Sequence, residues 1–288
     1  MAKEVWQGPL EKAGECRWLI PKSYSEGMRV PGLIYADEGL LEHIRTDKTP
    51  LQVANVAHLP GIQKFSLAMP DIHWGYGFCI GGVAGIDVED GVVSPGGVGY
   101  DINCGVRLVR TNLTLKDVQQ KMRDLVNALY ENIPSGVGSK GKVRISGKEV
   151  EDVLLNGARW AVKNGFGWQE DTLYTEAGGS LPGADPHEAS QRAIERGKPQ
   201  LGSLGAGNHF LEIQIVDEVF EQKGAQVMGI EKGQIVVMIH TGSRGLGYQV
   251  CDDYIKVLGH AMDRYGIKVP DRQLACAPVN SKEGKEYL

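Results

Sequence analysis

The fold is organised around residues 71–110, which read DIHWGYGFCIGGVAGIDVEDGVVSPGGVGYDINCGVRLVR. Glycine is dense here, and glycines between strands let the backbone approach another backbone or a ligand closely. The interleaved apolar residues predict short buried strands, at Val83, Val92, Val93, Val106, Leu108 and Val109. Asp101 and Cys104 lie on a tight loop of this stretch. A carboxylate and a thiol on one loop are two candidate ligands of one metal site.

The composition is that of a globular protein. The 288 residues are enough for a large core in one big domain or two, and the 42% hydrophobic and 23% charged fractions are ordinary. A net charge of −5 gives no support for nucleic-acid binding, although it leaves room for a local basic groove. The five cysteines form no CxxC pair and no disulfide framework. No run has the length of a membrane span and residues 1–7 lack a signal-peptide pattern, so we expect a cytoplasmic protein without a membrane partner.

Hydrophobic periodicity predicts an α+β fold with a β-rich central body of mixed sheets. Strands of this body are expected at residues 65–70, 211–216 and 235–239, and the last is expected to be buried on both faces because it is continuously apolar. Residues 114–196 are expected to form a helical excursion within a single domain spanning residues 1–288. Helices are predicted after the cap residue Thr114 and at 38–45, 51–59, 148–164, 187–196 and 248–264.

Three more side chains at strand ends complete a candidate site. Asp71 ends one predicted strand, His209 follows a glycine-rich turn, and His240 ends another strand. With Asp101 and Cys104 they give a mixed nitrogen, oxygen and sulfur donor set that suits zinc, manganese, iron or cobalt. The alternative stays open, because a single histidine at a strand end is more often a hydrogen-bonded structural residue and a buried cysteine is usually packing. No pair has the short spacing of a zinc finger.

Two glycine-containing turns are candidate phosphate contacts. Residues 205–209, GAGNH, are not a P-loop, because no Gly-Lys-Ser/Thr follows, and not a Rossmann fingerprint, because they precede a strand. Residues 241–245, TGSRG, precede a predicted helix, so their amides and Arg244 can hold an anion. An ordinary strand-to-helix turn explains the same residues equally well. Arg196 belongs to a group of basic residues that can line a phosphate-binding face, although an exposed charged surface is the commoner explanation.

Four blocks of this sequence together resemble the signature blocks of the RtcB family of GTP-dependent RNA-splicing ligases. They are PDIHWGYG at 70–77, DINCGVR at 101–107, GAGNHFLE at 205–212 and HTGSRG at 240–245, in the order that the family has them. The resemblance runs through essentially the whole chain and implies an RtcB-like fold. It also implies an RNA ligase that joins 3′-phosphate or 2′,3′-cyclic phosphate ends to 5′-hydroxyl ends, as in tRNA halves or broken RNAs. Family members use GTP and two Mn(II) ions, pass through a guanylylated histidine, and often need an archease-type activator.

The resemblance also implies a role for each matching residue. Asp101, Cys104, His209 and His240 correspond to manganese ligands, with Cys104 bridging both ions. Asp71 resembles the carboxylate that orients the guanylylated histidine. The remaining matches are Asn208 as a contact to the guanylate phosphate, Phe210 and Glu212 at the guanine, and Arg196 and Arg244 as candidates for RNA phosphates.

One departure from the family pattern matters. The family's guanylylated histidine lies in a His-Gly-Ala-Gly-Arg block, which does not occur in this sequence. We therefore expect a chain truncated at its C-terminus, which cannot form the enzyme–GMP intermediate alone and is inactive in ligation. Two other functions stay open: a metal-dependent phosphoesterase that opens cyclic phosphates without ligation, and a non-catalytic RNA- or metal-binding fragment.

Overall fold

The computed structural model describes residues 5–288, and the chain divides into two compact units. The first unit consists of Met1–Tyr100 and Val250–Leu288, and the second of Asp101–Gln249. Helix α9 (Arg244–Tyr265) contributes to both units, because the second boundary falls inside it. That residues 1–288 behave as one domain stays a prediction.

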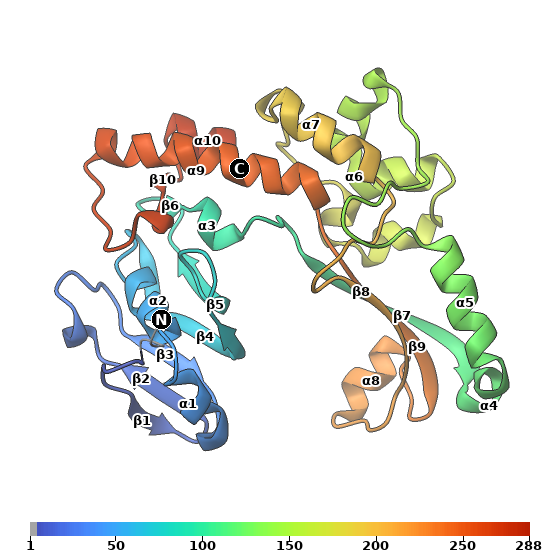
Figure 1. The fold of residues 1–288 in the computed structure, drawn as a ribbon, viewed down its shortest axis with the longest axis horizontal. Coiled ribbons are helices and arrows are strands. Elements are labelled where there is room, and N and C mark those ends of the chain that lie inside the picture. Colours follow the sequence, from blue (N-terminus) through green and yellow to red (C-terminus); the bar gives the residue numbers. More distant parts are fainter. Residues whose placement is uncertain (1–4) are drawn as a thin grey trace. The chain divides into compact units, whose positions relative to one another are not determined.

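A five-stranded sheet forms the base of the first unit (Figure 1). Its strands, in spatial order, are β1 (Glu11–Gly14), β2 (Arg17–Ile20), β3 (Gly32–Tyr35), β4 (Ile62–His73) and β5 (Ile80–Ile86). β3 and β4 are parallel and the other pairs are antiparallel. A parallel pair needs a long crossover, and this one carries helices α1 (Glu38–Ile44) and α2 (Thr49–Val56). The predicted mixed sheet is therefore confirmed, as are the two helices.

The rest of the first unit packs the two segments of the chain together. β6 (Val92–Val93) pairs antiparallel with β10 (Ala277–Pro278), which joins the segments directly. Leu258 of α9 and Leu274 are completely buried in two of the hydrophobic clusters. The remaining short elements are α3 (Pro95–Val98), α10 (Lys282–Tyr287) and the 3-10 turns Lys22–Tyr24 and Arg272–Leu274.

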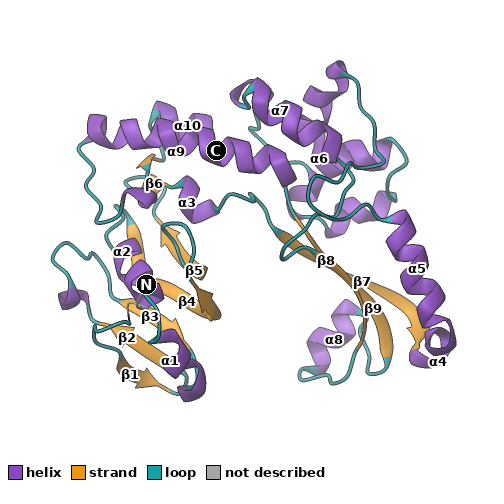
Figure 2. Cartoon of the chain, in the orientation of Figure 1, coloured by secondary structure: helices purple, strands orange, loops and turns teal. Residues whose placement is uncertain are grey.

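A three-stranded antiparallel sheet in the order β7-β9-β8 forms the centre of the second unit. Its strands are β7 (Gly105–Thr114), β8 (Phe210–Ile215) and β9 (Gln234–Thr241). Between β7 and β8 the named elements are all helical, and Figure 2 shows them as a group of helices and loops. They are α4 (Leu115–Val118), α5 (Met122–Asn132), α6 (Gly147–Lys163), α7 (Gln191–Gly197) and the 3-10 turns Gln119–Lys121, Gln169–Tyr174, Glu176–Gly179, Pro186–Glu188 and Lys198–Gln200. α8 (Gln222–Met228) lies between β8 and β9 in the chain.

The predicted strands exist, but the prediction that they are buried is wrong for several residues. Val83, Val106, Leu108 and Val109 are 46–54% exposed. β9 is buried only over its first part, and its second half is partly exposed. An apolar residue type sets strand propensity, whereas burial depends on what packs against each face, and β7 is an edge strand of a small sheet.

None of the helices in residues 5–288 combines the length and the hydrophobicity that a bilayer span requires.

Candidate metal centre

The register of the second sheet brings the candidate ligands to one edge. His240 is the second-last residue of β9, and it lies opposite Val106 of β7 and Phe210 of β8. In an antiparallel sheet the end of one strand lies beside the starts of its neighbours. The loop before β7, which carries Cys104, and the residue before β8, His209, therefore meet the end of β9.

Four donor atoms converge at this edge. Cys104 Sγ lies 3.3 Å from His209 Nε2 and 3.1 Å from His240 Nε2. Asp101 Oδ2 lies 2.6 Å from His209 Nε2. The donors of Asp101, Cys104 and His209 all lie within 4.8 Å of one another, a grouping that can hold a metal ion, and His240 approaches the sulfur as well. The structure therefore brings together the four side chains that the sequence suggested, while their role as metal ligands stays a prediction.

The Asp101 carboxylate is fixed by the turn that begins α9. The backbone N–H of Arg244 donates to Asp101 Oδ1 at 3.2 Å, and the Ser243 hydroxyl donates to the same oxygen at 3.3 Å. A Cβ added at Gly242 would collide with this carboxylate, so only glycine lets the turn pass so close. Ser243 and Gly242 are positioning residues whose role could not be derived from the sequence, because nothing there pairs them with Asp101.

The His209 ring is fixed by a second set of contacts. The Arg244 guanidinium lies 3.3 Å from Nδ1, on the side of the ring opposite Asp101 and Cys104. A Cβ at Gly205 would collide with both His209 and Arg244, and this explains the first glycine of the GAGNH block. A guanidinium has only N–H donors, so this contact is a hydrogen bond as long as His209 Nδ1 is the unprotonated nitrogen of the ring.

Two residues of the site have left-handed backbone conformations. Asn103, between Asp101 and Cys104, has φ +55°, and Arg244 has the same value. Asparagine tolerates this region better than most residues, whereas arginine does so at a cost of about 1–3 kcal/mol. Such conformations persist only when the surroundings fix them, as the contacts of the Arg244 amide and guanidinium do here.

The electrostatics of the site favour the binding of a cation. Partial desolvation, followed by the neighbouring Asp101 carboxylate, raises the pKa of the Cys104 thiol to about 11, although its side chain is exposed by surface area. The Asn208 amide, 3.7 Å from the sulfur, acts weakly in the opposite direction on this pKa. A thiol with this pKa is protonated near neutral pH, and metal coordination is the ordinary way to hold it as a thiolate.

The donor set fits a divalent ion. It combines a carboxylate oxygen, a sulfur and two imidazole nitrogens, the mixture expected for zinc, manganese, iron or cobalt. A purely structural hydrogen-bond network accounts for Asp101 and His209. It does not account for Cys104, because a thiol is a weak hydrogen-bond partner and here two imidazoles approach it.

The candidate guanine residues lie on the same sheet face as His240. The register places Phe210 and Glu212 opposite His240 and Met238. The Phe210 ring packs edge-on against the His240 ring, with centroids 5.3 Å apart and planes at 88°. The Glu212 carboxylate is exposed and accepts a hydrogen bond from Gln214 Nε2 at 2.7 Å. Residues 210, 212 and 214 alternate along β8 and so share one face of the sheet, and a contact to a guanine stays a prediction.

Asp71 and Arg196 occupy different surroundings. Asp71 belongs to the first unit and lies within β4, which continues to His73 instead of ending before Asp71 as predicted. Arg196 of α7 donates to the Gln249 side chain at 2.8 Å and lies over the Tyr248 ring, 4.7 Å from its centroid. The roles predicted for Asp71 and Arg196 stay predictions.

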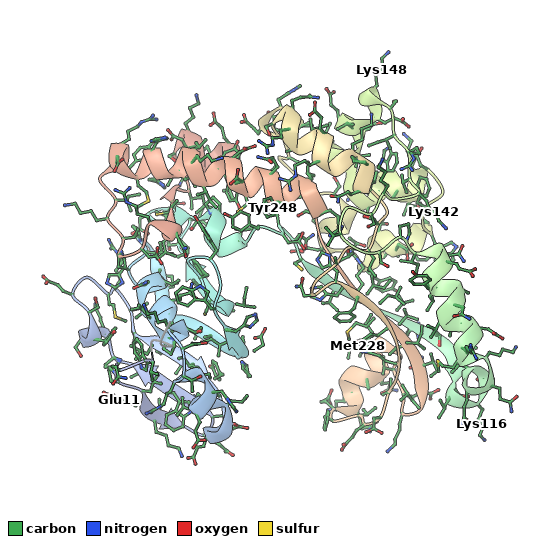
Figure 3. The ribbon with its side chains drawn as sticks, viewed as in Figure 1. Glu11, Lys116, Lys142, Lys148, Met228 and Tyr248 are labelled. Atoms are coloured by element: carbon green, nitrogen blue, oxygen red, sulfur yellow. The ribbon has the colours of Figure 1, made fainter. Side chains whose placement is uncertain are left out.

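Two lysines near the start of α6, Lys142 before it and Lys148 in its first turn, are solvent-exposed. Figure 3 shows Lys142 and Lys148 projecting outward from the second unit. This arrangement agrees with an exposed charged surface and gives no contact between these lysines and the four donors.

A family model described as tRNA-splicing ligase RtcB matches residues 52–288. The chain belongs to the RtcB family. The tRNA-splicing ligase RtcB of Archaeoglobus fulgidus is 56% identical over 282 residues, and the protein of the same description from Thermococcus kodakarensis is 55% identical over 280 residues. These matches cover 98% and 97% of this chain, and 58% of each relative. The chain thus spans a little under three fifths of the length of these curated RtcB relatives, and the family assignment suggested by the four blocks is confirmed.

Proposed function

We propose that this chain is the metal- and guanylate-binding part of an RNA ligase that uses GTP and two Mn(II) ions. Its substrates are RNA ends that carry a 3′-phosphate or a 2′,3′-cyclic phosphate, together with 5′-hydroxyl ends. The observation that carries the proposal is the position of Cys104 Sγ, 3.3 Å from His209 Nε2 and 3.1 Å from His240 Nε2. The relatives are described as tRNA-splicing ligases, which supports RNA as the substrate class.

The sulfur is the donor that two ions can share in this proposal. Asp101, Cys104 and His209 form one compact group, and His240 approaches the same sulfur from outside this group. Asp101, Cys104 and His209 would hold one ion, and Cys104 and His240 would contribute to the second. Bound divalent cations would neutralise phosphate charge and hold the thiolate.

The other residues of the site have supporting roles in this proposal. Ser243 and the Arg244 amide hold Asp101, and the Arg244 guanidinium orients His209. The Asn208 amide, beside the sulfur, would donate to a guanylate phosphate. Phe210 and Glu212 would contact the guanine from the sheet face. Several other expectations stay predictions. They are Asp71 as the orienting carboxylate, the guanylylated histidine, the inability of this chain to form that intermediate alone, the archease-type partner and the cytoplasmic location.

Metal binding by matched cysteine variants tests the proposal. We expect Cys104→Ala to weaken Mn(II) binding by more than the roughly 10- to 100-fold typical of outer-shell changes, because it removes a direct ligand. Cys16→Ala is the control, since Cys16 is also an exposed free cysteine but lies in the first unit. Calorimetry and electron paramagnetic resonance of bound Mn(II) give the measurement. Equal affinity of the Cys104→Ala and Cys16→Ala chains would contradict the proposed centre. Opening of cyclic-phosphate RNA without GTP, and without joining of the ends, would favour the phosphoesterase.

A further inference from the structure

The second unit contains a cavity to which the proposed function above assigns no role. Its volume is about 340 Å³, at the lower end of the roughly 300–1,000 Å³ typical of small-molecule sites. This size suits one small group instead of a length of extended chain. Most of the apolar part of its wall comes from three helices, with Val150, Val153 and Leu154 on α6, Ile194 on α7 and Leu246 on α9. Figure 1 shows α6 and α7 beside the first turns of α9.

Other residues of the wall are polar or cationic. Gln200, Ser203, Ser243 and Arg244 line the cavity, and Lys198 adds a second positive charge. The amide of Gly245 donates to Gln200 Oε1 at 2.8 Å, so the amide at the start of α9 is already engaged. The cationic side chains, and not the helix terminus, are therefore the groups that can meet an anion here.

Arg244 connects the cavity to the candidate metal centre. Its guanidinium lies 3.5 Å from the Ser203 hydroxyl and 3.3 Å from His209 Nδ1. Ser243, also in the cavity wall, donates to Asp101. A ligand in the cavity therefore lies against the same turn that holds two of the four donors, with the Arg244 cation between the apolar space and those donors.

This combination selects a particular ligand chemistry. Apolar side chains accept the face of a flat, weakly polar ring, as they do for bases held out of a stack. A guanidinium at the edge of the cavity binds a phosphate by donating hydrogen bonds to its oxygens. We propose that the cavity binds the base of the nucleotide that ends the RNA 3′-phosphate strand, with its phosphate directed to Arg244 and the four-donor centre. This inference rests on the proposed function, which supplies the phosphate-bearing RNA end.

The chemistry of the wall also predicts how selective the cavity is. Aliphatic walls contact the π-face that every base has, so binding has little sequence preference. The loss of the base, in contrast, removes the whole contact.

The test compares RNA oligonucleotides that bind to the 288-residue chain with Mn(II) present. One has a normal 3′-terminal nucleotide with a 3′-phosphate, one has an abasic terminal nucleotide with the same phosphate, and one has a normal nucleotide with a 3′-hydroxyl. Fluorescence anisotropy gives the affinities. We expect the abasic end to bind about tenfold or more weakly than the normal end, because the apolar contact area of one base is lost.

Variants that fill the cavity assign the effect to its walls. Val153→Trp fills it from α6 and Ile194→Trp fills it from α7, so the two variants perturb different helices. Both should bind the normal end as weakly as the abasic end, and neither should respond further to base removal. Leu155→Trp is the control, because Leu155 is 43% exposed on α6 and does not line the cavity. Melting curves identify a variant that fails to fold. In the unsubstituted chain, nuclear Overhauser contacts between base protons and the methyl groups of Val153 or Ile194 give a measurement that needs no variant.

The outcomes separate this inference from the proposed function. Absence of an abasic penalty, or a penalty that persists unchanged in both filled variants, overturns the base site even if the 3′-phosphate is preferred over the 3′-hydroxyl. A base effect that is removed by filling, with no preference for the phosphate, supports the base site and counts against the phosphate centre. No measurable RNA binding overturns both.

Discussion

The first unit contains the large clusters of buried apolar residues, whereas the second unit carries the polar centre on a sheet with exposed apolar positions. Within residues 5–288, the three clusters of buried hydrophobic residues all belong to the first unit. In the second unit, Val106 and Leu108 of β7 are 54% and 46% exposed, and the site depends on directed contacts such as those of Ser243 and Arg244. Burial of apolar side chains therefore stabilises the first unit, whereas hydrogen bonds and close glycine contacts fix the site of the second.

The largest expected effect is on the core of the first unit. Leu258 is completely buried, so Leu258→Ala should lower the free energy of unfolding by about 2–5 kcal/mol, measured by urea denaturation. Val257→Ala is the control on the same helix, because Val257 is 39% exposed and its truncation should change stability by less than about 1 kcal/mol. Mn(II) affinity of the folded Leu258→Ala chain should stay unchanged. Weaker Mn(II) binding by the folded Leu258→Ala chain would contradict this difference between the units, because the centre would then depend on the core of the first unit.

The next effect is stabilisation of the second unit by its ligand, and it rests on the proposed function. Mn(II) at a hundred times its dissociation constant should stabilise the folded state by about 2.7 kcal/mol. Hydrogen exchange should slow at residues 101–106, 209–212 and 238–244, and much less in β2 and β3 of the first unit. Cys104→Ala should remove this protection. Equal slowing of hydrogen exchange in both units would contradict the inference that the site orders the second unit separately from the first.

A smaller effect is expected from the close contact at Gly242. Gly242→Ala places a methyl group against the Asp101 carboxylate, so the carboxylate or the turn must move. We expect Mn(II) affinity to fall about tenfold, as for other changes to groups that orient a ligand. Gly147→Ala is the matched control in the same unit, because a Cβ there meets no atom within 4 Å. If both variants bind Mn(II) as the unsubstituted chain does, the turn does not position Asp101.

The comparison of the units also separates what the sequence could predict from what it could not. Local signals were sufficient for the cap at Thr114, where the Thr114 amide donates to Asp117 Oδ2 at 2.7 Å, and for α6, predicted at 148–164 and found at Gly147–Lys163. These features depend on residues a few positions apart. Exposure of β7 could not be predicted, because it depends on which elements cover the sheet.

The candidate centre shows the same division. The donor residues could be chosen by chemical type and by their places at strand ends, and the family resemblance specified them further. Their fixation could not be derived, because Ser243 and Gly242 lie far from Asp101 in the sequence and meet it only through the sheet register. The apolar cavity was missed for a similar reason, since its walls come from three separate helices.

The smallest expected effect concerns the cap of α6 in the second unit. Its contribution to stability depends on pH, whereas the contribution of a buried leucine does not. Hydrogen bonds from the Ser146 backbone and hydroxyl lower the pKa of Glu149 from its ordinary value near 4.5. A carboxyl group with a lowered pKa binds protons less readily in the folded state than in the unfolded state. Its contribution is therefore complete above about pH 4.5 and is lost as the pH falls through the lowered value. Acidification should loosen the start of α6, which the Ser146 amide resonance will report, and Glu149→Gln should remove most of this pH dependence. Glu151→Gln, the same change on the same helix, should leave it intact, and identical titrations of the two variants would mean that the cap does not sense pH.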